Sequence, residues 1–598
     1  MKANTDSRIV SQVFFRLLPV QILIVAMGSV NSIVDGLIAG RFIAPESVGV
    51  IGLYYTMVRV LEAVGAVLLG GTAVLCGKYM GSGRTDKTQG VFSLNLTVTF
   101  LIGAALTAVN LLMPGRLAGL LGAEGTLKTD LAVYAVGYAI GMIPQLLAQQ
   151  MAAFLQLERQ SRLGYIGIAS MIFVNVALDV LLVAVLDMGV WGLALATSAC
   201  NWVYFLILAS YYVRGKAQLK FRVKIASWKE LPDMIKIGFP AALLVFALAV
   251  RSLVLNRIVL AYGGADGLSA MSAFNMICAF LLAPALGAGA VIRMLTSVFV
   301  GEEDRESIYA LLRLAGTKVL LMMCGLGVLV LLLASPMAGL YFPDHGTEVF
   351  QLTRLLFRIY SVCVPMAFIC ILFSNYFQAR EHRLFVNIVA LFDGFFGVII
   401  PVLVLAPAFG IKGICFAILV GLIITAALTP IYVMIRNKGL PRNRDEWLLL
   451  PESFGTGERL SFVLKDTDAV TRTAEQVQTF CSARGVSTRT SYYAALCLEE
   501  MAENVVLHGF TKGKPRDYTI DVRVVLQEGK KILLRIKDDC VPFDPAERAK
   551  LVNNEDPCAN IGIRMVYASA DEVVYQNLLG LNVLTIRLQD KESITHEA

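Results

Sequence analysis

Long apolar runs fill the first 436 residues of the chain. A helix needs about 20 predominantly apolar residues to cross a bilayer, and twelve stretches before Arg436 meet that requirement. They lie near residues 12–38, 48–76, 91–113, 131–156, 163–186, 189–213, 234–262, 269–299, 315–340, 354–378, 384–408 and 411–436. The first is too long for a cleavable signal peptide, and others follow it at once. The pattern predicts an all-α polytopic membrane protein with twelve transmembrane helices.

The pattern changes after Arg436. A short linker rich in glycine and proline, residues 437–457, leads into a segment of ordinary soluble composition, residues 458–590. Alternating patterns predict strands at 460–464, 518–527, 532–537, 573–576 and 583–588, and helices at 469–484, 490–508 and 563–570. This order of short strands and helices predicts a compact α+β sandwich. We call residues 458–590 the tail domain.

The membrane half repeats itself. Pro19 matches Pro240, and Gly189 in Gly-Val-Trp-Gly matches Gly410 in Gly-Ile-Lys-Gly; the members of each pair are 221 positions apart. The two repeats are residues 1–215 and 216–436. Each repeat holds six predicted helices, so both enter the membrane in the same direction. Two parallel six-helix bundles that face each other across a central cleft are typical of transporters.

The charges predict an orientation. Apolar residues make up 57% of the chain and charged residues 16%, and the mean hydropathy is +0.68. Lysine and arginine gather in alternate loops, with six of them between residues 214 and 229. By the positive-inside rule, both termini face the cytosol of a multi-pass protein of the plasma or inner membrane. These loops also account for the net charge of +7, so the expected partner is the lipid bilayer and no nucleic acid.

Carboxylates in the first repeat have no counterparts in the second, where Ile400 replaces Asp179. Counting along the helices places Asp35, Asn175, Asp179 and Thr197 in the outer half of the membrane. Asn175 and Asp179 also share one helix face. This oxygen-rich set suits Na⁺ or a shared proton, because an uncompensated charge in the bilayer is costly. In the alternative, Asp35 is interfacial and Asp179 hydrogen-bonds a neighbouring helix.

The second repeat instead carries Arg251 and Arg358 in its outer half. Two arginines beside a central cleft would favour anionic cargo. In the alternative, Arg358 lies near its helix end and snorkels to the interface, or either arginine pairs with Asp393.

Residues 10–436 resemble the multidrug and toxic compound extrusion (MATE) family. The stretches that carry the resemblance are Val34-Asp35-Gly36, Phe154-Leu-Gln-Leu-Glu-Arg159, Asn175-Val-Ala-Leu-Asp179 and Phe409-Gly-Ile-Lys-Gly413. The resemblance implies cation-coupled export of small organic solutes by alternating access. It also implies that Asp35, Asn175, Asp179 and Thr197 bind Na⁺ or H⁺. Arg251 and Arg358 depart from relatives that place carboxylates in the corresponding helices.

In the tail domain, Glu500, Asn504 and His508 fall on one face of a predicted helix, and a loop beginning at Asp538 follows. This pattern resembles the histidine-kinase-like ATPase fold and, within it, the anti-sigma-factor serine kinases. The resemblance implies that Asn504 holds Mg²⁺, that Asp538 recognises the adenine amino group of ATP, and that Glu500 is a general base for phosphoryl transfer. Gly562 would belong to the second glycine box of that family.

Two positions depart from this family, because Cys540 and Asn560 stand where it prefers glycine. We expect nucleotide binding to be retained, and we leave serine or threonine kinase activity open. In the alternative, the tail domain is a protein-binding module with a weakened pocket.

The sequence thus favours a Na⁺- or H⁺-coupled exporter whose tail domain binds ATP and Mg²⁺ and either regulates transport or signals to a protein partner. One rival is a membrane sensor with a kinase output. Against it, no histidine lies between His382 and His508 to accept phosphate. The other rival is a flippase for lipid-linked saccharides.

Overall fold

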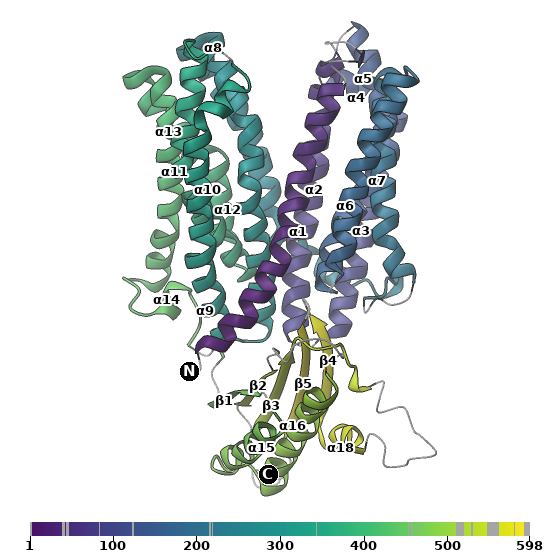
Figure 1. Cartoon of the computed structure of the whole chain (residues 1–598), viewed down its shortest axis with the longest axis vertical. Helices are drawn as coiled ribbons and strands as arrows, with labels where there is room; N and C mark the ends of the chain where they lie inside the picture. Colours follow the sequence, from purple (N-terminus) through teal and green to yellow (C-terminus); the bar gives the residue numbers. More distant parts are fainter. Residues whose placement is uncertain are drawn as a thin grey trace.

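A computed structural model describes most of residues 3–590 (Figure 1). Outside the described part lie residues 39–41, 44–46, 83, 122, 124, 159, 215–216, 218, 343, 453, 456–457, 465, 510–519, 528–529, 547–560 and 579–580. The side chains of residues 27–37, which include Asp35, are also outside it, and so is Asn560.

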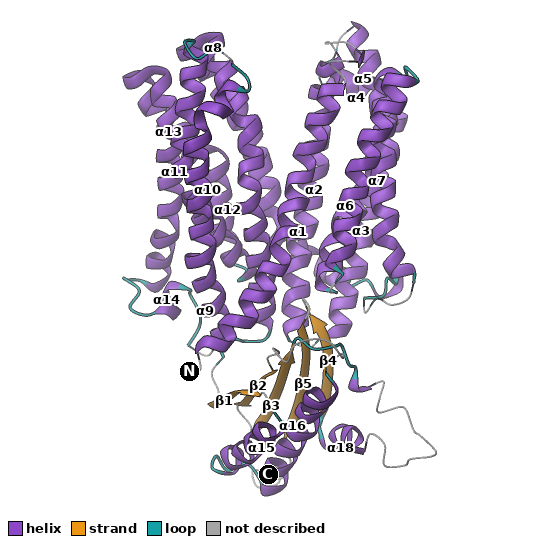
Figure 2. Cartoon of the chain, in the orientation of Figure 1, coloured by secondary structure: helices purple, strands orange, loops and turns teal. Residues whose placement is uncertain are grey.

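The membrane half is helical throughout its described part (Figure 2). Its α-helices are α1 (Ala3–Ile38), α2 (Ser47–Gly81), α3 (Thr85–Leu112), α4 (Pro114–Leu120), α5 (Gly125–Leu157), α6 (Ser161–Asp179), α7 (Gly189–Val213), α8 (Leu231–Gly301), α9 (Arg305–Leu314), α10 (Leu320–Gly339), α11 (Glu348–Ala379), α12 (Arg383–Leu391) and α13 (Gly397–Asn437). Three π-helical segments interrupt them, η2 (Val180–Val185), η5 (Ala315–Val319) and η6 (Phe392–Phe396), and the short 3-10 turns η3 (Val223–Ile225) and η4 (Trp228–Glu230) precede α8.

Ten segments of the described chain are long and apolar enough to cross a membrane. The sequence predicts twelve, and the difference lies in two places. The described apolar part of α1 is the shorter segment Val10–Ala26, and the last two predicted spans form one continuous segment, Arg383–Asn437. Within that segment the backbone turns at Gly410, and α8 turns in the same way at Gly264.

The backbone bears out one feature of the repeat. Gly189 and Gly410, which the repeat pairs, have φ of +57° and +58°. Only glycine enters this region without a steric penalty, because it lacks a Cβ atom. In each repeat the glycine permits the turn that joins two apolar helices.

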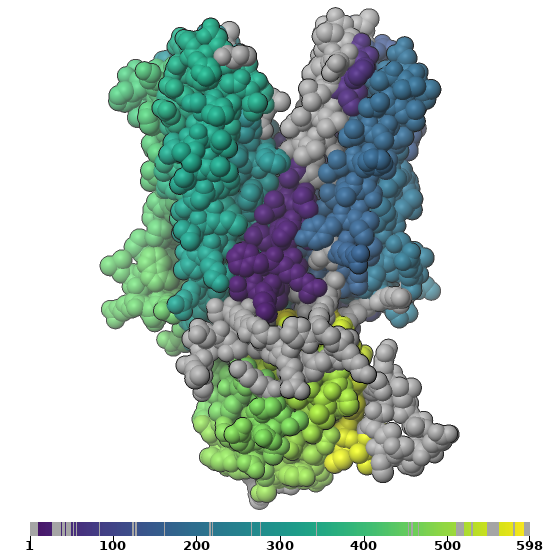
Figure 3. Space-filling model, viewed as in Figure 1, coloured from purple at the N-terminus to yellow at the C-terminus, as the bar shows by residue number. Residues whose placement is uncertain are grey.

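The membrane half forms two lobes, one from α1–α7 and the other from α8–α13 (Figure 1). In the space-filling view they stand apart at the end far from the tail domain and meet at the end near it (Figure 3). Glycines bring α2 and α8 together there: a Cβ on Gly81 would lie 2.1 Å from the carbonyl oxygen of Val298, and one on Gly301 would lie 2.1 Å from that of Lys78. The lobes are therefore in close backbone contact next to the tail domain.

The tail domain is a five-stranded antiparallel sheet with helices on one face (Figures 1 and 2). The strands are β1 (Glu458–Leu464), β2 (Ile520–Gln527), β3 (Lys531–Asp538), β4 (Glu572–Leu578) and β5 (Leu581–Gln589), in the order β1-β2-β3-β5-β4. The helices are α15 (Thr467–Ser482), α16 (Thr488–His508) and α18 (Ile561–Ser569). Each predicted tail strand and helix is confirmed, with ends shifted by a few residues. Inward-facing residues of the sheet, such as Val522, Leu534 and Ile586, form the core with α15 and α16.

The linker is packed against the membrane half. It contains the short helix α14 (Arg444–Trp447). The Tyr376 hydroxyl donates to the carbonyl of Leu448 at 2.9 Å, and Arg305 Nη2 donates to the carbonyl of Phe454 at 2.6 Å. These bonds place the start of the tail domain beneath α9 and α11.

Candidate functional sites in the membrane half and the tail

The candidate cation site lies on α6. Asn175 and Asp179 occupy the last two turns of this helix, and both side chains are completely buried. Neither the oxygen nor the nitrogen of the Asn175 amide has a hydrogen-bond partner among the described residues. A buried amide without any partner costs on the order of 1–3 kcal/mol, so the partner of this amide is a group outside the described residues or a bound ligand.

Two other helices border this site. Thr197, on α7, is buried, and its hydroxyl donates to the carbonyl of Leu193 at 3.1 Å. Both α7 and α1, which carries Asp35, pack against α6. Asp179 is the last residue before the π-helical segment η2, a feature the sequence did not predict. Single π-helical turns often occur at functional sites, because they redirect the side chains around them.

The second lobe uses its arginines differently. Arg251, on α8, donates from Nη1 to the carbonyl oxygen of Asp393 at 3.0 Å, and Asp393 lies in the π-helical segment η6. The contact agrees with the expected alternative in which Arg251 pairs with Asp393, although the bond is to the backbone. Arg358, on α11, is exposed. The two arginines therefore have different surroundings.

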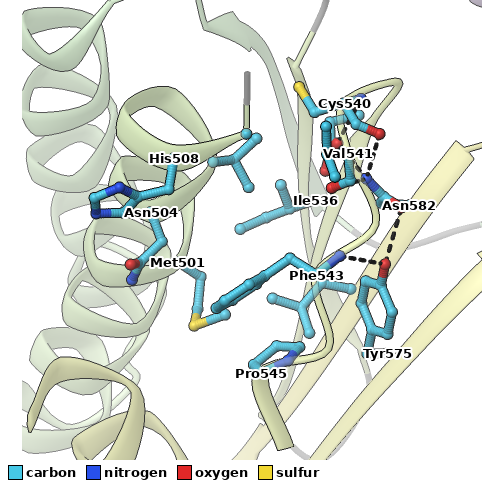
Figure 4. A pocket seen from close by; sticks show the side chains of 14 residues that line it. Met501, Asn504, His508, Ile536, Cys540, Val541, Phe543, Pro545, Tyr575 and Asn582 are labelled. Atoms are coloured by element: carbon cyan, nitrogen blue, oxygen red, sulfur yellow. Dashed lines mark hydrogen bonds between the residues drawn. The ribbon is translucent and has the colours of Figure 1, made fainter. Parts of the chain in front are cut away.

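The tail domain contains a pocket between α16 and the sheet (Figure 4). Asn504 and His508 line it from α16, while Asp538, Phe543 and Asn582 line it from the sheet and the loop after β3. The sequence predicted that Asn504 and Asp538 face the same ligand, and the structure places both in this pocket. His508, predicted on the same helix face, also lines it.

Asp538 is held in a hydrogen-bond network. Its Oδ1 accepts from the backbone N–H of Cys540 at 2.9 Å and from Asn582 Nδ2 at 2.6 Å. Asn582 Oδ1 in turn accepts from the Tyr575 hydroxyl at 2.9 Å and from Asn577 Nδ2 at 2.6 Å. Burial raises the pKa of Asp538, and the two bonds to its carboxylate oppose that rise. The network fixes the orientation of Asp538, the one carboxylate among the described residues that line the pocket.

Glu500 lies on α16, one helical turn before Asn504. It contacts Gly562 of α18. A Cβ on Gly562 would lie 1.7 Å from Glu500 Oε2, so a larger residue at this position would force the Glu500 carboxylate to move. Burial raises the pKa of Glu500, and the charges of Glu503 and Glu499 raise it further. A raised pKa strengthens a carboxylate as a proton acceptor. Asn504 Nδ2 donates to the backbone carbonyl of Glu500 at 2.6 Å.

Cys540 is accommodated by a glycine that the sequence analysis did not single out. A Cβ on Gly509, which follows α16, would lie 3.0 Å from Cys540 Cβ. The N–H of Val541 donates to the carbonyl of Gly509 at 3.0 Å. Cys540 is buried and does not have a positive φ. A glycine at position 540 would let the loop after β3 approach α16 closely. Here Gly509, at the end of α16, allows that approach instead.

Comparison with known proteins covers both halves of the chain. The MatE family model matches residues 21–181 and 240–403, which together exceed half of the chain. The model of the histidine kinase-like ATPase domain matches residues 463–588. The multidrug export protein MepA of Staphylococcus haemolyticus is 25% identical over 427 residues, covering 69% of this chain and 92% of MepA.

Two solved structures share the fold of the membrane half. The bent form of the MATE transporter VcmN from Vibrio cholerae is 19% identical with a TM-score of 0.65 and covers 71% of this chain and 96% of VcmN. The outward-facing form of a multidrug resistance MATE transporter is 18% identical with a TM-score of 0.66, covering 72% and 96%.

The two lobes, the membrane-spanning helices and the polar site inside one lobe define a multi-pass membrane transporter. The chain belongs to the MATE family, and it carries a C-terminal histidine kinase-like ATPase domain.

Proposed function

We propose that the chain exports small organic solutes across the plasma or inner membrane by exchanging them for Na⁺ or H⁺. The observation that carries this proposal is the buried Asn175 amide, which has no hydrogen-bond partner among the described residues and lies one turn before the buried Asp179. In this proposal the cation binds at Asp35, Asn175, Asp179 and Thr197. The similarity to MepA, a multidrug export protein, supports export of organic solutes.

In the same proposal the membrane half has twelve transmembrane helices and both termini face the cytosol. The segment Arg383–Asn437 then crosses twice, with its turn at Gly410, and α1 supplies the first span. The concentration of lysine and arginine in the loops near the tail domain supports this orientation. The splayed end of the lobes then faces outward (Figure 3).

For the tail domain we propose binding of ATP with Mg²⁺. Asn504 would hold Mg²⁺, because an amide oxygen is a ligand of the type that this hard cation prefers. Asp538 would accept a hydrogen bond from the adenine amino group, and Glu500 would be the general base if phosphate is transferred to a partner. The pocket lined by Asn504 and Asp538 supports binding, and the resemblance to anti-sigma-factor serine kinases supports the assignment of kinase chemistry. A regulatory protein partner would be its substrate.

The charge of the cargo and the choice between rival functions are also part of this proposal. In this proposal Arg358, which is exposed, would favour anionic cargo, whereas Arg251 already donates to the backbone of Asp393. A sensor kinase would move no solute and a flippase would move a lipid-linked saccharide, so transport of soluble organic solutes separates both from our first choice.

The test is transport by the full-length protein in proteoliposomes. Na⁺ and pH gradients are imposed separately, an organic cation and an organic anion are compared as cargo, and ATP is present or absent on the side of the tail domain. We expect one of the two gradients to drive export without ATP. Export that strictly requires ATP hydrolysis, or that ignores both gradients, would contradict the proposal.

A further inference from the structure

The outer face of the tail sheet is charged and buried. Side chains alternate along a strand, so Arg535 and Lys537 of β3 point away from the core that Leu534 and Ile536 face. Arg523 of β2 is the register partner of Arg535 and lies on the same face. All three cationic side chains are more than nine-tenths buried. Cations at such positions are rarely buried unless they are paired, so this face is built to meet another surface.

That surface is the turn between α8 and α9, residues 302–304. Arg523 Nη1 lies 2.5 Å from Asp304 Oδ1, and Lys537 Nζ lies 2.5 Å from Glu302 Oε2. Arg535 Nη1 donates to the backbone carbonyl of Glu302 at 3.1 Å. The acidic turn and the basic sheet face are thus complementary in charge and in hydrogen bonding.

Asp304 has two roles at this contact. It caps α9 by accepting from the N–H of Ser307 at 3.0 Å and from the Ser307 hydroxyl at 2.7 Å. Burial alone would raise the pKa of Asp304, but Arg523, Lys537 and Ser307 together hold it well below its usual range. The turn is therefore shaped by the same carboxylate that receives the tail domain.

Apolar contacts extend the interface. Val583 and Leu581 of β5 belong to the hydrophobic cluster of the membrane half, not to the core of the tail domain. The ammonium group of Lys537 also lies 5.7 Å from the centre of the Phe299 ring at the end of α8.

The sheet also reaches the other lobe. Arg587 Nη2, on β5, donates to the carbonyl oxygen of Ser82 at 2.9 Å, and Ser82 lies in the turn between α2 and α3. The offset that relates the two repeats places Ser82 opposite Glu303. One rigid sheet therefore contacts equivalent turns of both lobes.

These turns lie where the lobes touch. Gly81 and Gly301 allow α2 and α8 to cross in backbone contact directly above the sheet. Lys78 Nζ lies 2.7 Å from Glu381 Oε1 of the other lobe, and the Tyr79 hydroxyl donates to Glu230 at 2.8 Å. Alternating access requires the lobes to separate at this end when the transporter faces the cytosol. A domain held by both lobes opposes that separation.

We infer that the outer face of the tail sheet is a clamp on the closed cytosolic gate, and that nucleotide in the pocket on the opposite face changes how tightly it holds. The inference rests on the proposed function for the direction of the membrane and for the ligand of the pocket. Lys537, which faces the clamp, and Asp538, which faces the pocket, are consecutive residues of β3. Their register partners on β5 follow the same division: Val583 faces the clamp, and Asn582 faces the pocket. A ligand that pulls on Asp538 or Asn582 therefore moves the strands that carry the clamp.

The clamp is tested in the full-length protein in nanodiscs and proteoliposomes. Lys537→Glu reverses one charge of the clamp, and Lys531→Glu is the matched control, because Lys531 is an exposed residue at the other end of β3. We expect Lys537→Glu to raise amide hydrogen exchange in residues 299–306 by about tenfold or more, since protected backbone becomes open to solvent. We also expect turnover at a fixed ion gradient to rise by about fivefold, the low end of coupling between sites.

The double variant Glu302→Lys with Lys537→Glu swaps the two charges. It should return both hydrogen exchange in residues 299–306 and turnover toward the values of the unmodified protein. Protection of α16 amides from hydrogen exchange shows that each variant retains a folded tail domain, and the fluorescent ATP analogue TNP-ATP reports nucleotide binding. Unchanged exchange in residues 299–306 and unchanged turnover in a Lys537→Glu protein with a folded tail domain would overturn the clamp. Equal effects in Lys531→Glu would overturn it as well.

The coupling has its own readout. ATP with Mg²⁺ should change exchange in residues 299–306 by about twofold or more in the unmodified protein, and Asp538→Asn should abolish the change. Bound nucleotide without any change in exchange would overturn the coupling. If TNP-ATP does not bind at all, the nucleotide assignment fails, while the Lys537→Glu comparison still decides the clamp. If neither a Na⁺ gradient nor a pH gradient drives export, the proposal of cation coupling is wrong. Amide hydrogen exchange in residues 299–306 still tests the clamp in that case.

Discussion

The two lobes share a backbone plan but not their chemistry. In the first lobe Asn175 and Asp179 are polar and completely buried. The repeat places Phe396 and Ile400 at the equivalent positions of the second lobe, and these side chains are 41% and 48% exposed. The glycine turns at Gly189 and Gly410 are nevertheless nearly identical.

This difference separates what duplication preserves from what function requires. The repeated glycine turn is backbone geometry, which both lobes need to reverse direction between apolar helices. The polar pair is found in one lobe, and the other lobe instead has Arg251 in contact with the backbone of Asp393. In the proposed function, this asymmetry would let one lobe respond to the cation while the other serves as a frame.

The sharpest test of this asymmetry replaces one carboxylate in each lobe by an amide. We predict that Asp179→Asn lowers gradient-driven transport by more than about tenfold. Removing a residue that only supports a metal ligand typically costs about 10–100-fold in affinity or activity, and Asp179 would be a ligand itself. Asp393→Asn is the matched variant in the second lobe, and we predict a much smaller effect, because Arg251 is held by the Asp393 backbone carbonyl. Counterflow of labelled cargo measures both in proteoliposomes. Equal losses in the two variants would remove the distinction between the lobes.

The proposed nucleotide pocket of the tail domain should be separable from the proposed cation site of the membrane half. Asn504→Ala should weaken Mg²⁺-dependent TNP-ATP binding by about 10–100-fold, because a metal ligand is lost. Glu475→Ala, at an exposed position on α15, is the control and should bind normally. Fluorescence titration with and without Mg²⁺ measures the difference. If Asn504→Ala weakens binding equally in the absence of Mg²⁺, Asn504 does not act through the metal.

The sequence predicted elements well wherever a regular pattern spans many residues. The tail strands and helices follow from alternation and helical periodicity, and α16 brings Asn504 and His508 to one pocket as expected. Three features lay beyond that reasoning because they depend on contacts between distant segments. Gly509 makes room for Cys540, and Glu500 packs on Gly562. The docking of Lys537 on Glu302 joins residues 235 positions apart.

Close contact of the lobes gives the third prediction. Gly301→Ala places a methyl group 2.1 Å from the backbone oxygen of Lys78, and a backbone atom cannot rotate away. Overpacking of this kind costs about 1–3 kcal/mol, so we predict a lower melting temperature and slower transport. Gly325→Ala is the control, because among the described residues no atom beyond its own stretch of helix lies within 4 Å of the new Cβ, and its effect should stay within about 0.5 kcal/mol. Thermal unfolding in nanodiscs measures both. A Gly301→Ala protein as stable as Gly325→Ala would show that the lobes do not meet at this crossing in the membrane.

The smallest expected effect concerns the pH dependence of the tail contact. The pKa of Asp304 is lowered in the docked state by Arg523, Lys537 and Ser307, against the opposing influence of burial. A group whose pKa is lowered on docking contributes its full stabilisation above its undocked pKa, about 3.9, and loses it as the pH falls through the docked value. We therefore predict that hydrogen exchange in residues 299–306, corrected for its intrinsic pH dependence, shows constant protection from pH 8 down to pH 5. Protection should weaken only in stronger acid. A loss of protection centred between pH 6 and pH 7 would mean that a group other than Asp304 controls docking, because the Asp304 carboxylate is already fully ionised throughout that range.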